Sequence, residues 1–529
     1  MIYDMPQFEP RYHAKVSPNA VAFKMCDSGE TVSFAQLDAR ANQGAHIMRE
    51  FGIATGDHIA ILMENRREFL EICFAADRSG VYYTTISTHL TSDEIAYIID
   101  DCDACMLISS AKFDDILSVL QPKFETYCPL FLVGPSRLIN ECKVKGDQTI
   151  FCWKEKLQLQ PKTPIKDEVQ GLDMLYSSGT TGRPKGIKWN LSGEEPGQKT
   201  MLIDLLTTLY GYNSATRYLC PAPLYHAAPL RHSMVTIKAG GSVFIMPRFD
   251  ALDALSLIDK EEITHSQWVP TMFVRFLKLP KHKLKNFNLS SMEMAVHAAA
   301  PCPIDVKHKM LAWWGPIIYE YYAGTENNGF TSITTEEWLD HPGSVGKAKL
   351  GIAHICDEGG KELPIGKEGE VYFENGHQFE YHKDYEQTKS SRNNLGWTTL
   401  GDIGRMDEEG YLYLTDRKSF VIISGGVNVY PQETENILIS HPAVLDAAVI
   451  GVPNIDFGEE VRAIVQLMPN QKASTHIHDE LIAYIQSHLS KIKCPKIIEF
   501  REELPRSATG KLYKRKLKEE YWINDLKIS

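Results

Sequence analysis

The sequence predicts an α/β protein in which a large N-terminal domain of layered α/β subdomains is followed by a small α+β C-terminal domain. Three observations support this prediction. The chain has 529 residues, more than a single domain usually holds. Apolar, strand-like runs alternate with amphipathic helical patterns over much of its length. Near residues 416–420 the pattern changes to shorter elements, which indicates a separate domain.

Helices and strands alternate in the N-terminal part. Residues 31–50 predict an amphipathic helix with an apolar face formed by Leu37, Ala41, Ala45 and Met48. The next predicted elements are a strand at 58–65, a helix ending in glycine at 69–80, strands at 105–110 and 130–136, and a similar pattern at 242–270. Because strands separated by helices usually pair in parallel, we expect parallel sheets covered by helices.

The C-terminal part begins with a turn-rich β segment at 410–430. Pro431 is predicted to open a capped helix, because proline is favoured at the first helical position. A helix at 476–490, a strand at 496–504 and a basic tail follow. We therefore place the N-terminal domain at 1–417 and the C-terminal domain at 418–529.

Composition limits the classes of partner and compartment. A net charge of −12 argues against a broad nucleic-acid surface. The N-terminus has no signal-peptide core, and no run approaches the ~20 apolar residues of a membrane span. The 11 cysteines form no framework, and the Cys102/Cys105 pair has no companion ligands, which suits a reducing compartment. We expect a cytoplasmic protein and leave peripheral membrane contact, and a monomer or homodimer, as open alternatives.

Residues 175–190 read LYSSGTTGRPKGIKWN, a composition typical of phosphate binding. Glycines let backbone N–H groups approach an anion, hydroxyls donate to its oxygens, and a lysine neutralises its charge. The common phosphate loop ends in Gly-Lys-Ser/Thr, but here Pro184 takes the second-glycine position and Gly186 follows Lys185. A solvated Ser/Thr/Gly loop is the alternative.

Further motifs follow in a fixed order. They are YSSGTTGRPKG (176–186), PAPLYHAAPL (221–230), YYAGTEN (321–327), GWTTLGD (396–402), GYLYLTDRKSFVIISGGVNVYP (410–431) and LPRSATGKLYKRKL (504–517). Together they resemble the adenylate-forming superfamily of acyl-CoA synthetases, adenylation domains and luciferases, and within it the AMP-forming acyl-CoA synthetases. Each motif alone is also compatible with a purely structural role, such as a turn, a helix cap or a surface charge. Their order over nearly the whole chain favours the functional interpretation.

The resemblance implies a first half-reaction in which ATP and a carboxylic acid form an acyl-adenylate. It assigns Glu326 as the Mg²⁺ ligand, Thr325 as a donor to the α-phosphate, His226 to the aromatic-histidine segment, and Lys511 as the cation at the reacting carboxylate and phosphate. These four are the candidate catalytic residues. The β- and γ-phosphates are assigned to Ser177, Ser178, Gly179, Thr180, Thr181, Gly182 and Lys185.

The same resemblance implies the nucleotide site. Tyr322 stands where an aromatic ring stacks on adenine, and Asp402 where a carboxylate accepts both ribose hydroxyls, with Arg417 beside it. Relatives often carry two glycines in the adenine-lining segment where this chain has Ala298 and Ala299, so the methyl groups are expected to narrow the acyl channel.

A second half-reaction, with coenzyme A as the acceptor, is also implied. The small domain is expected to swing about a hinge after Arg417, so that Ser424, Gly425 and Gly426 face the pantetheine arm while Lys511 leaves the site. Ser419 takes the hinge position, where close relatives carry a charged residue. Small glycines allow close backbone approach.

The expected acyl-pocket residues indicate a hydrophobic substrate. They are Tyr225, His226, Trp268, Val269, Met272, Phe273 and Ala300. The sequence therefore predicts a carboxylate–CoA ligase for a fatty or other hydrophobic monocarboxylic acid, with a role in fatty acid or lipid metabolism. The alternatives are an aryl- or sterol-acid ligase, an enzyme that loads a carrier protein, a luciferase-like oxidase and a non-catalytic binding protein.

Overall fold

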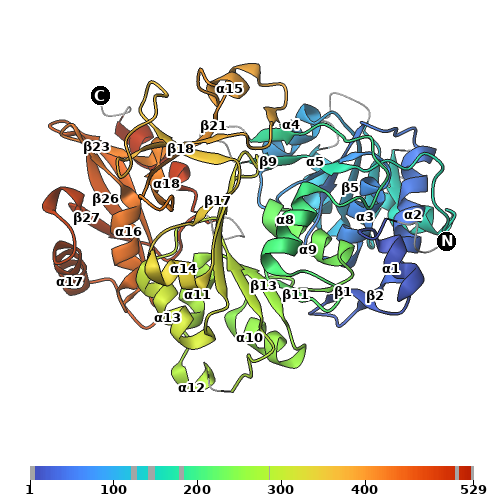
Figure 1. The fold of residues 1–529 in the computed structure, drawn as a ribbon, viewed down its shortest axis with the longest axis horizontal. Coiled ribbons are helices and arrows are strands. Elements are labelled where there is room, and N and C mark those ends of the chain that lie inside the picture. Colours follow the sequence, from blue (N-terminus) through green and yellow to red (C-terminus); the bar gives the residue numbers. More distant parts are fainter. Residues whose placement is uncertain are drawn as a thin grey trace. The chain divides into compact units, whose positions relative to one another are not determined.

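The computed structural model describes residues 6–120, 128–140, 149–177, 184–284, 286–506 and 512–525 (Figure 1). The chain divides into two compact units. Unit 1 comprises Met1–Trp268, Leu279–Val296 and Gln378–Thr388, and unit 2 comprises Val269–Lys278, His297–His377 and Lys389–Ser529. Within the described residues, no helix combines the length and the apolarity needed to cross a membrane.

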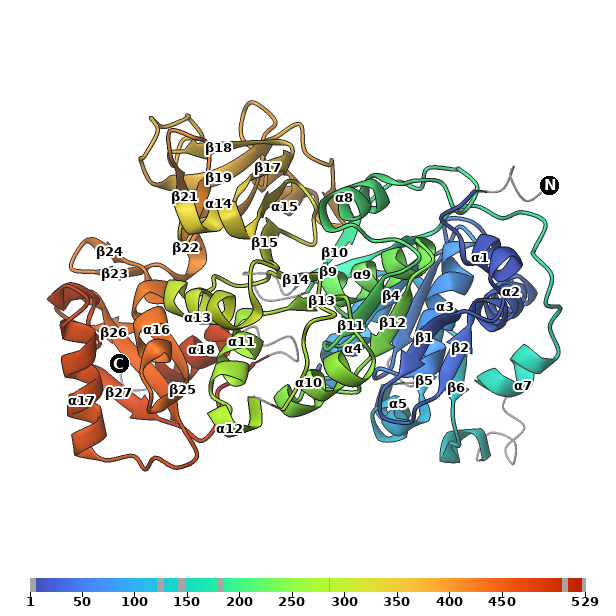
Figure 2. The same ribbon diagram turned by 60° about the horizontal axis from the view of Figure 1, so that its bottom comes forward.

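Unit 1 contains a six-stranded sheet in which every pairing is parallel (Figure 2). Its order is β7 (Ile150–Cys152), β6 (Leu130–Val133), β5 (Ala104–Ser110), β3 (His58–Leu62), β4 (Tyr82–Thr85) and β8 (Leu172–Asp173). The strands predicted at 58–65, 105–110 and 130–136 all belong to it. This confirms the expected parallel α/β architecture.

Further strands of unit 1 form two more arrangements. One orders β14 (Met294–His297), β13 (His265–Trp268), β11 (Arg217–Cys220), β12 (Ser242–Ile245), β1 (Val21–Met25) and β2 (Thr31–Ser33). The other is a small antiparallel sheet of β20 (Glu380–Tyr381), β10 (Lys185–Lys188) and β9 (Leu175–Ser177). The β9–β10 hairpin places the two ends of the predicted phosphate-binding segment side by side.

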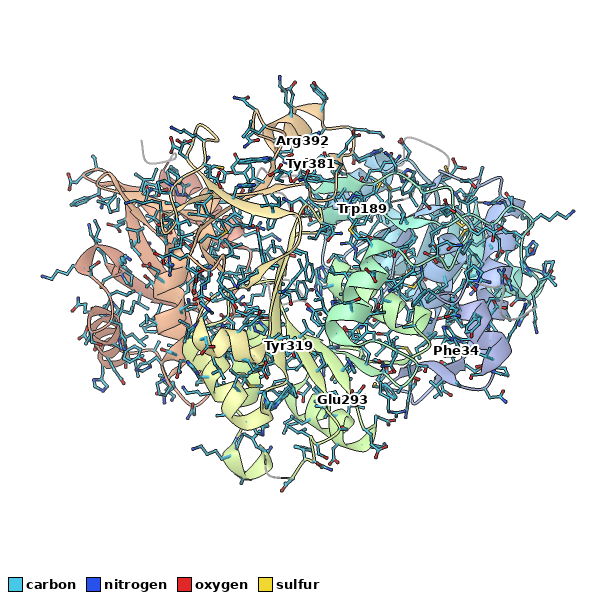
Figure 3. The ribbon with its side chains drawn as sticks, in the orientation of Figure 1. Phe34, Trp189, Glu293, Tyr319, Tyr381 and Arg392 are labelled. Atoms are coloured by element: carbon cyan, nitrogen blue, oxygen red, sulfur yellow. The ribbon has the colours of Figure 1, made fainter. Side chains whose placement is uncertain are left out.

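The helices of unit 1 bury side chains in its core, with the exception of α12, which has no buried residue. They are α1 (Pro10–Val16), α2 (Phe34–Glu50), α3 (Arg67–Asp77), α4 (Ser92–Asp101), α5 (Asp114–Leu120), α7 (Trp153–Gln158), α8 (Met201–Tyr210), α9 (Ala227–Lys238), α10 (Ala251–Lys260) and α12 (Lys281–Leu284). On α2, Leu37, Ala41, Ala45 and Met48 are completely buried, as predicted, and Phe34 joins them in the core (Figure 3). A reciprocal capping box of Ser33 and Gln36 fixes the start of this helix.

Unit 2 is built from antiparallel sheets and one mixed sheet. The strands β15 (Ile318–Ala323), β16 (Phe330–Ile333) and β17 (Lys347–Leu350) pair antiparallel, as do β18 (Ile352–Cys356), β19 (Gly369–Glu374), β21 (Thr398–Met406) and β22 (Leu412–Arg417). Its helices before residue 417 are α11 (Pro270–Leu277), α13 (Ile304–Trp314) and α14 (Thr335–Asp340), while α15 (Tyr385–Ser390) runs from a segment of unit 1 into one of unit 2.

The C-terminal part of unit 2 has the predicted α+β composition. Its sheet contains β24 (Val427–Val429), β23 (Ile422–Ser424), β26 (Gly458–Leu467) and β25 (Val444–Asn454), and β27 (Ile497–Phe500) pairs parallel with β26. Its helices are α16 (Pro431–Ser440), α17 (Thr475–Gln486) and α18 (Lys514–Asp525). A single 3₁₀ turn, Lys418–Phe420, connects this part to β22. The boundary proposed at residues 417 and 418 falls at the start of that turn.

The start of α16 differs in one detail from the prediction of a capped helix. Pro431 is at the first helical position as expected, but Tyr430, the N-cap residue, makes no side-chain cap hydrogen bond. Instead the Asp416 carboxylate, at the end of β22, accepts the backbone N–H of Gln432 at 3.0 Å. The free N–H groups of a helix start need an acceptor, and a residue distant in the sequence supplies it here.

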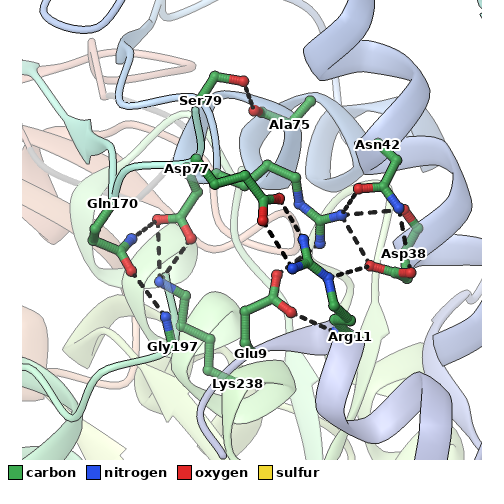
Figure 4. Close-up of polar contacts among 12 residues, drawn as sticks. Glu9, Arg11, Asp38, Asn42, Ala75, Asp77, Ser79, Gln170, Gly197 and Lys238 are labelled. Atoms are coloured by element: carbon green, nitrogen blue, oxygen red, sulfur yellow. Dashed lines mark hydrogen bonds and ion pairs between the residues drawn. The ribbon is translucent and has the colours of Figure 1, made fainter. Parts of the chain in front are cut away.

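A buried polar network fixes the N-terminal segment of unit 1 (Figure 4). The Arg78 guanidinium is completely buried; it contacts Glu9 Oε1 at 2.7 Å and Asp38 Oδ1 at 2.9 Å. It also donates to Asn42 Oδ1 at 2.5 Å. A second buried pair, Lys238 and Asp77, lies beside it at 2.9 Å. These contacts tie the segment around α1 to α2, α3 and α9.

We expect Arg78→Met to lower the free energy of unfolding by about 3–5 kcal/mol, because the buried Glu9 carboxylate would lose its cation. Urea denaturation of the full chain measures this change. The matched control is Arg137→Met, whose guanidinium is 55% exposed in its pair with Asp115 and is worth about 0–1 kcal/mol. Equal effects of the two changes would contradict a structural role for the network.

Candidate active site

The centre of the predicted nucleotide site is the carboxylate of Asp402 on β21. Asp402 pairs in register with Arg417 on the neighbouring strand β22. Arg417 Nε donates to Asp402 Oδ1 at 2.9 Å, and the Tyr322 hydroxyl on β15 donates to Oδ2 at 2.6 Å. Asp402 is 6% exposed. Three residues predicted from separate motifs are therefore in direct contact.

The electrostatics of this triad keep Tyr322 and Arg417 in their donor forms. Burial, followed by the nearby Asp402 carboxylate, raises the pKa of Tyr322 well above its usual range. The Asp402 carboxylate also raises the pKa of Arg417. Tyr322 thus remains a hydroxyl and Arg417 remains charged at neutral pH. A carboxylate offers about four lone-pair positions, so Asp402 retains acceptor capacity for a pair of ligand hydroxyls.

The Thr325–Glu326 segment forms the turn that follows β15. At Gly324 an added Cβ would lie 2.3 Å from Leu400 Cδ1 and 2.8 Å from Glu326 Oε2, so a larger residue would require these two side chains to shift. Asn327 has a φ of 52°, a left-handed conformation that asparagine tolerates. The turn buries Glu326, which is 7% exposed, and its carboxylate contributes to the raised pKa of Arg417.

Glu326 fits the chemistry of a magnesium ligand. Mg²⁺ prefers oxygen ligands and usually takes only one or two carboxylates, with substrate phosphates and water completing its shell. Across the residues that the structure describes, His, Cys, Asp and Glu side chains form no group of three that could hold a metal alone. The carboxylate present therefore suits an ion held jointly with a ligand's phosphates.

Ala299 has a strained backbone. Its φ is 76°, in the left-handed region where glycine is favoured. Ala298, its neighbour, has no such conformation and is 4% exposed. The family resemblance places two glycines at these positions, and the structure explains the preference at Ala299 alone.

The predicted phosphate segment is described only at its ends. Ser177 ends β9, Lys185 begins β10, and the two pair in register. The Lys185 ammonium lies 5.4 Å from the centre of the Tyr381 ring. Ser178, Gly179, Thr180, Thr181 and Gly182 lie outside the described residues, and so does Lys511.

Most of the expected acyl-pocket residues are buried, while His226 is half-buried and Ala300 is exposed. His226 is the N-cap of α9 and its ring lies 4.7 Å from that of Tyr225. Trp268 and Phe273 are completely buried. Trp268 Nε1 donates to Ser266 Oγ at 2.6 Å, and the Phe273 ring packs on His297. Both side chains are buried in this structure, and their place in the acyl pocket stays a prediction.

The predicted thiol loop is a tight hairpin between β23 and β24. Ser424 pairs with Val427, and Gly425 and Gly426 have φ values of 57° and 80°. Two successive positive φ values are typical of a type I′ turn. Gly425 N donates to Phe457 O at 2.9 Å. Both glycines are exposed, so their backbone is open to a ligand.

Sequence reasoning missed the contacts that connect the C-terminal part with the rest of unit 2. Besides Asp416, Lys418 Nζ contacts Glu370 Oε2 at 3.0 Å. Lys278 Nζ donates to the carbonyl of Val444, and burial lowers the pKa of Lys278 to about 8. The acidic and basic residues beside Arg417 were visible in the sequence, but their partners were not.

The basic tail is also less solvated than its composition suggests. Lys514 is 7% exposed and pairs with Glu435 at 2.9 Å. Lys518 pairs with Glu459 at 2.8 Å. Lys516 is exposed. The described part of the basic tail is therefore not uniformly solvated.

Comparison with known proteins assigns the chain to a class that fits this site. The AMP-binding enzyme model matches residues 11–380, and the model of the AMP-binding enzyme C-terminal domain matches 433–511. The chain therefore belongs to the AMP-binding enzyme family, which confirms the predicted adenylate-forming resemblance and the large and small domains.

Individual members of the family match this chain over nearly its whole length. The chain is 29% identical to the long-chain-fatty-acid–CoA ligase FadD13 of Mycobacterium tuberculosis, covering 97% of each chain. It is 27% identical to a feruloyl-CoA synthase of Amycolatopsis, covering 97% of this chain and 98% of that protein. Its structure is similar to that of ATP-bound MatB from Rhodopseudomonas palustris, with a TM-score of 0.79, 28% identity and 98% coverage of both chains.

We expect Ala299→Gly to raise the free energy of unfolding by about 0.5–1 kcal/mol. A left-handed backbone costs an L-residue about 1–2 kcal/mol, and replacing Ala299 by glycine removes this cost from the folded state. The greater freedom of glycine in the unfolded chain opposes this gain by about 0.4–1 kcal/mol. Ala298→Gly is the matched control and should destabilise by about 0.5–1 kcal/mol. Denaturation of both variants would show opposite signs; the same sign in both would contradict strain at Ala299.

Proposed function

We propose that the protein is an ATP-dependent carboxylate–CoA ligase that activates a fatty or other hydrophobic monocarboxylic acid as its acyl-adenylate. The observation that best supports this is the Asp402 carboxylate, held by Tyr322 and Arg417 in a buried site with acceptor capacity left over. The AMP-forming acid–thiol ligase class predicted from the sequence is confirmed at the level of class, since the relatives are named as CoA ligases or synthases.

In this proposal Asp402 binds the nucleotide through its ribose. A cis-diol presents two adjacent hydroxyl donors, and a single carboxylate can accept both. The hydrogen bonds from Tyr322 and Arg417 hold the carboxylate still before the ligand arrives, so less ordering is needed on binding. The Tyr322 ring, which belongs to an apolar cluster with Phe373, offers a face to the adenine.

Activation joins a carboxylate oxygen to the α-phosphorus of ATP, and pyrophosphate leaves. Negative charge is concentrated at that junction, so a cation aimed there lowers the barrier. We assign this role to Lys511, with Thr325 donating to the α-phosphate and His226 beside the acid. Ser177, Lys185 and the segment between them would bind the β- and γ-phosphates. Mg²⁺, held by Glu326, would supply charge neutralisation over the phosphates.

Transfer to coenzyme A requires a thiol to reach the acyl carbon. The thiolate attacks that carbon, the acyl–phosphate bond breaks, and AMP leaves. The exposed Gly425–Gly426 backbone supports our placement of the pantetheine arm along this turn, next to Ser424, because it has no side chain to obstruct the arm. The proposal requires the domain after residue 417 to rotate between the two steps.

The acid itself is proposed at the level of a hydrophobic monocarboxylate. FadD13 is named for long-chain fatty acids, which favours that class. An aryl acid is the second candidate, because the feruloyl-CoA synthase matches the chain over nearly the same length. A cytoplasmic location stays a prediction from the sequence.

We expect pyrophosphate release with a fatty acid and ATP, and acyl-CoA when coenzyme A is added. Lys511→Ala should slow pyrophosphate release about 100- to 1,000-fold, because a donor to transition-state charge is worth about 3–4 kcal/mol. It should still convert supplied acyl-adenylate and coenzyme A to the thioester.

The exposed Lys516 is the matched control, and Lys516→Ala should change neither step appreciably. Pyrophosphate release with aryl acids and not with fatty acids would favour an aryl-acid ligase. Absence of release with fatty, aryl, sterol and amino acids would refute the ligase proposal. Equal loss of both steps in Lys511→Ala would argue against rotation.

The metal assignment predicts that Glu326→Gln lowers the adenylation rate by orders of magnitude while the fold is retained, because the amide keeps the shape but loses the charge that binds Mg²⁺. The measurements are pyrophosphate release at saturating ATP and a magnesium titration. Glu337→Gln, on the capping box of α14, controls for a glutamate lost elsewhere in unit 2. Unchanged adenylation in the Glu326 variant would remove this residue from the mechanism.

A further inference from the structure

The start of strand β25 makes a contact that connects the predicted acyl-pocket helix with the C-terminal part of unit 2. Lys278 is the C-cap residue of α11, the helix that begins at Pro270. Its ammonium donates to the carbonyl of Val444 and lies 3.5 Å from the carbonyl oxygen of Leu445. All of these residues belong to unit 2. The contact therefore joins segments that lie on either side of the turn at 418–420 in the sequence.

A β-bulge interrupts the ladder where these carbonyls lie. In the pairing of β25 with β26, Val444 is opposite Leu467 and Asp446 is opposite Gln466, so the register shifts between them. The extra residue of a bulge is left outside the ladder, and the strand bends there. We call Val444, Leu445 and Asp446 the bulge segment. It is a local irregularity at which a donor from another element meets backbone acceptors.

The bulge segment also anchors one end of the segment that carries Lys511. The Arg506 guanidinium donates to both carboxylate oxygens of Asp446, with Nη2 2.5 Å from Oδ1. Two parallel hydrogen bonds of this kind fix the orientation of both groups. Arg506 also forms an antiparallel bridge with Leu512. Lys511 itself lies outside the described residues, but the residues that flank its segment are paired with each other and held on β25.

Lys278 is removed from water at this contact. Burial lowers the pKa of Lys278 to about 8, and the nearby Asp446 carboxylate opposes the decrease. Taking an ammonium out of water is costly unless it is hydrogen-bonded, so its acceptors matter. A lysine at a helix end can also interact with the partial negative charge of its own helix. That role needs no acceptor on another element, whereas the acceptors of Lys278 are on β25.

The location of the contact favours the acyl-adenylate step over thioester formation. Helix α11 carries Met272 and Phe273, two of the residues predicted to line the acyl pocket, and its 8 residues make it about 12 Å long. Lys278 therefore holds the bulge segment, and with it Arg506, at the helix against which the acid is expected to bind. A cation that acts at the reacting carboxylate must come from that side.

We propose that Lys278 is a positioning residue for acyl-adenylate formation, because it holds the bulge segment, and through it Arg506 and the base of the Lys511 segment, against α11. The inference rests on the proposed ligase function and adds to it a residue that lies outside every motif of the sequence. Lys278 touches no reacting atom in this proposal. Its contact must break when the domain after residue 417 rotates, so it contributes to the first half-reaction and not to the second.

The test compares Lys278→Met with the parent in both half-reactions of the full-length chain. We expect the kcat of pyrophosphate release with a fatty acid and ATP to fall about tenfold, since a hydrogen bond from a charged donor is lost, while the KM for ATP is retained. Thioester formation from supplied acyl-adenylate and coenzyme A should be at least as fast as in the parent. Arg275→Met removes an exposed cation of the same helix and should change neither step.

A double-variant cycle tests the path through Asp446. Asp446→Asn removes the charge that holds Arg506 and should also slow pyrophosphate release. The combined variant should be slowed by clearly less than the product of the two single factors, because both changes release the same segment. Effects that multiply would overturn the path. Equal loss of both half-reactions in Lys278→Met would overturn the positioning role and leave a purely structural one.

Amide hydrogen exchange separates a failure of this inference from a failure of the ligase proposal. We expect residues 443–447 and the turn at 418–420 to exchange faster in Lys278→Met than in the parent and in Arg275→Met, because the segment is no longer held. Absence of pyrophosphate release from the parent with every acid tested would refute the ligase proposal, and with it the catalytic role of the contact. Parent-like exchange and parent-like pyrophosphate release in Lys278→Met would overturn this inference alone.

Discussion

The buried carboxylate of Asp402 is the constraint on which the predicted nucleotide site depends. Its two oxygens accept from Tyr322 on β15 and Arg417 on β22, so it joins strands from two different sheets of unit 2. A buried carboxylate without partners would be costly. The arginine supplies the opposite charge, and the two hydrogen bonds fix the orientation of the carboxylate. Each of the three residues is therefore needed for the other two to be in place.

The same strand end also determines how the small domain begins. Along β22 and the turn after it, three successive side chains have three different partners: Asp416 caps α16 at Gln432, Arg417 contacts Asp402, and Lys418 contacts Glu370. Successive strand residues point to opposite faces, which explains why neighbours in sequence reach different elements. A rotation after Arg417 must break the Asp416 and Lys418 contacts while leaving the nucleotide contact intact.

Periodicity alone predicted much of unit 1. The run at 58–65 and the helix at 31–50 are local patterns whose apolar residues must be buried, so β3 and α2 follow from the sequence. The cap of α16 could not be predicted, because its acceptor lies 16 residues upstream in another element. The burial of Lys514 in the basic tail could not be predicted for the same reason, since it depends on Glu435, a distant residue.

The site shows the same limit. Tyr322 and Asp402 are 80 residues apart, and nothing local in the sequence indicates that they touch. Only the order of motifs, interpreted through the family resemblance, placed them together. The WVPTMF segment was identified as a segment, but the sequence cannot say which of its side chains face inward; Trp268 is completely buried.

The free energies of individual contacts distinguish the parts of the chain that can move from those that cannot. Arg78 is completely buried, and its loss would leave the Glu9 carboxylate without its cation at a cost of about 3–5 kcal/mol, so the segment around α1 is not expected to move. The Lys418–Glu370 pair is different, because Lys418 is 55% exposed and such a pair is worth about 0–1 kcal/mol. A helix cap such as Asp416 adds about 1 kcal/mol. Together these two contacts amount to about 2 kcal/mol. The hydrogen bond from Lys278 to Val444 O, which a rotation must also break, adds about 1 kcal/mol. Differential binding of a substrate, typically about 1–3 kcal/mol, can supply such a sum. The weak contacts beside Arg417 are thus compatible with a domain that changes position in each catalytic cycle, whereas stronger ones would hold it in one state.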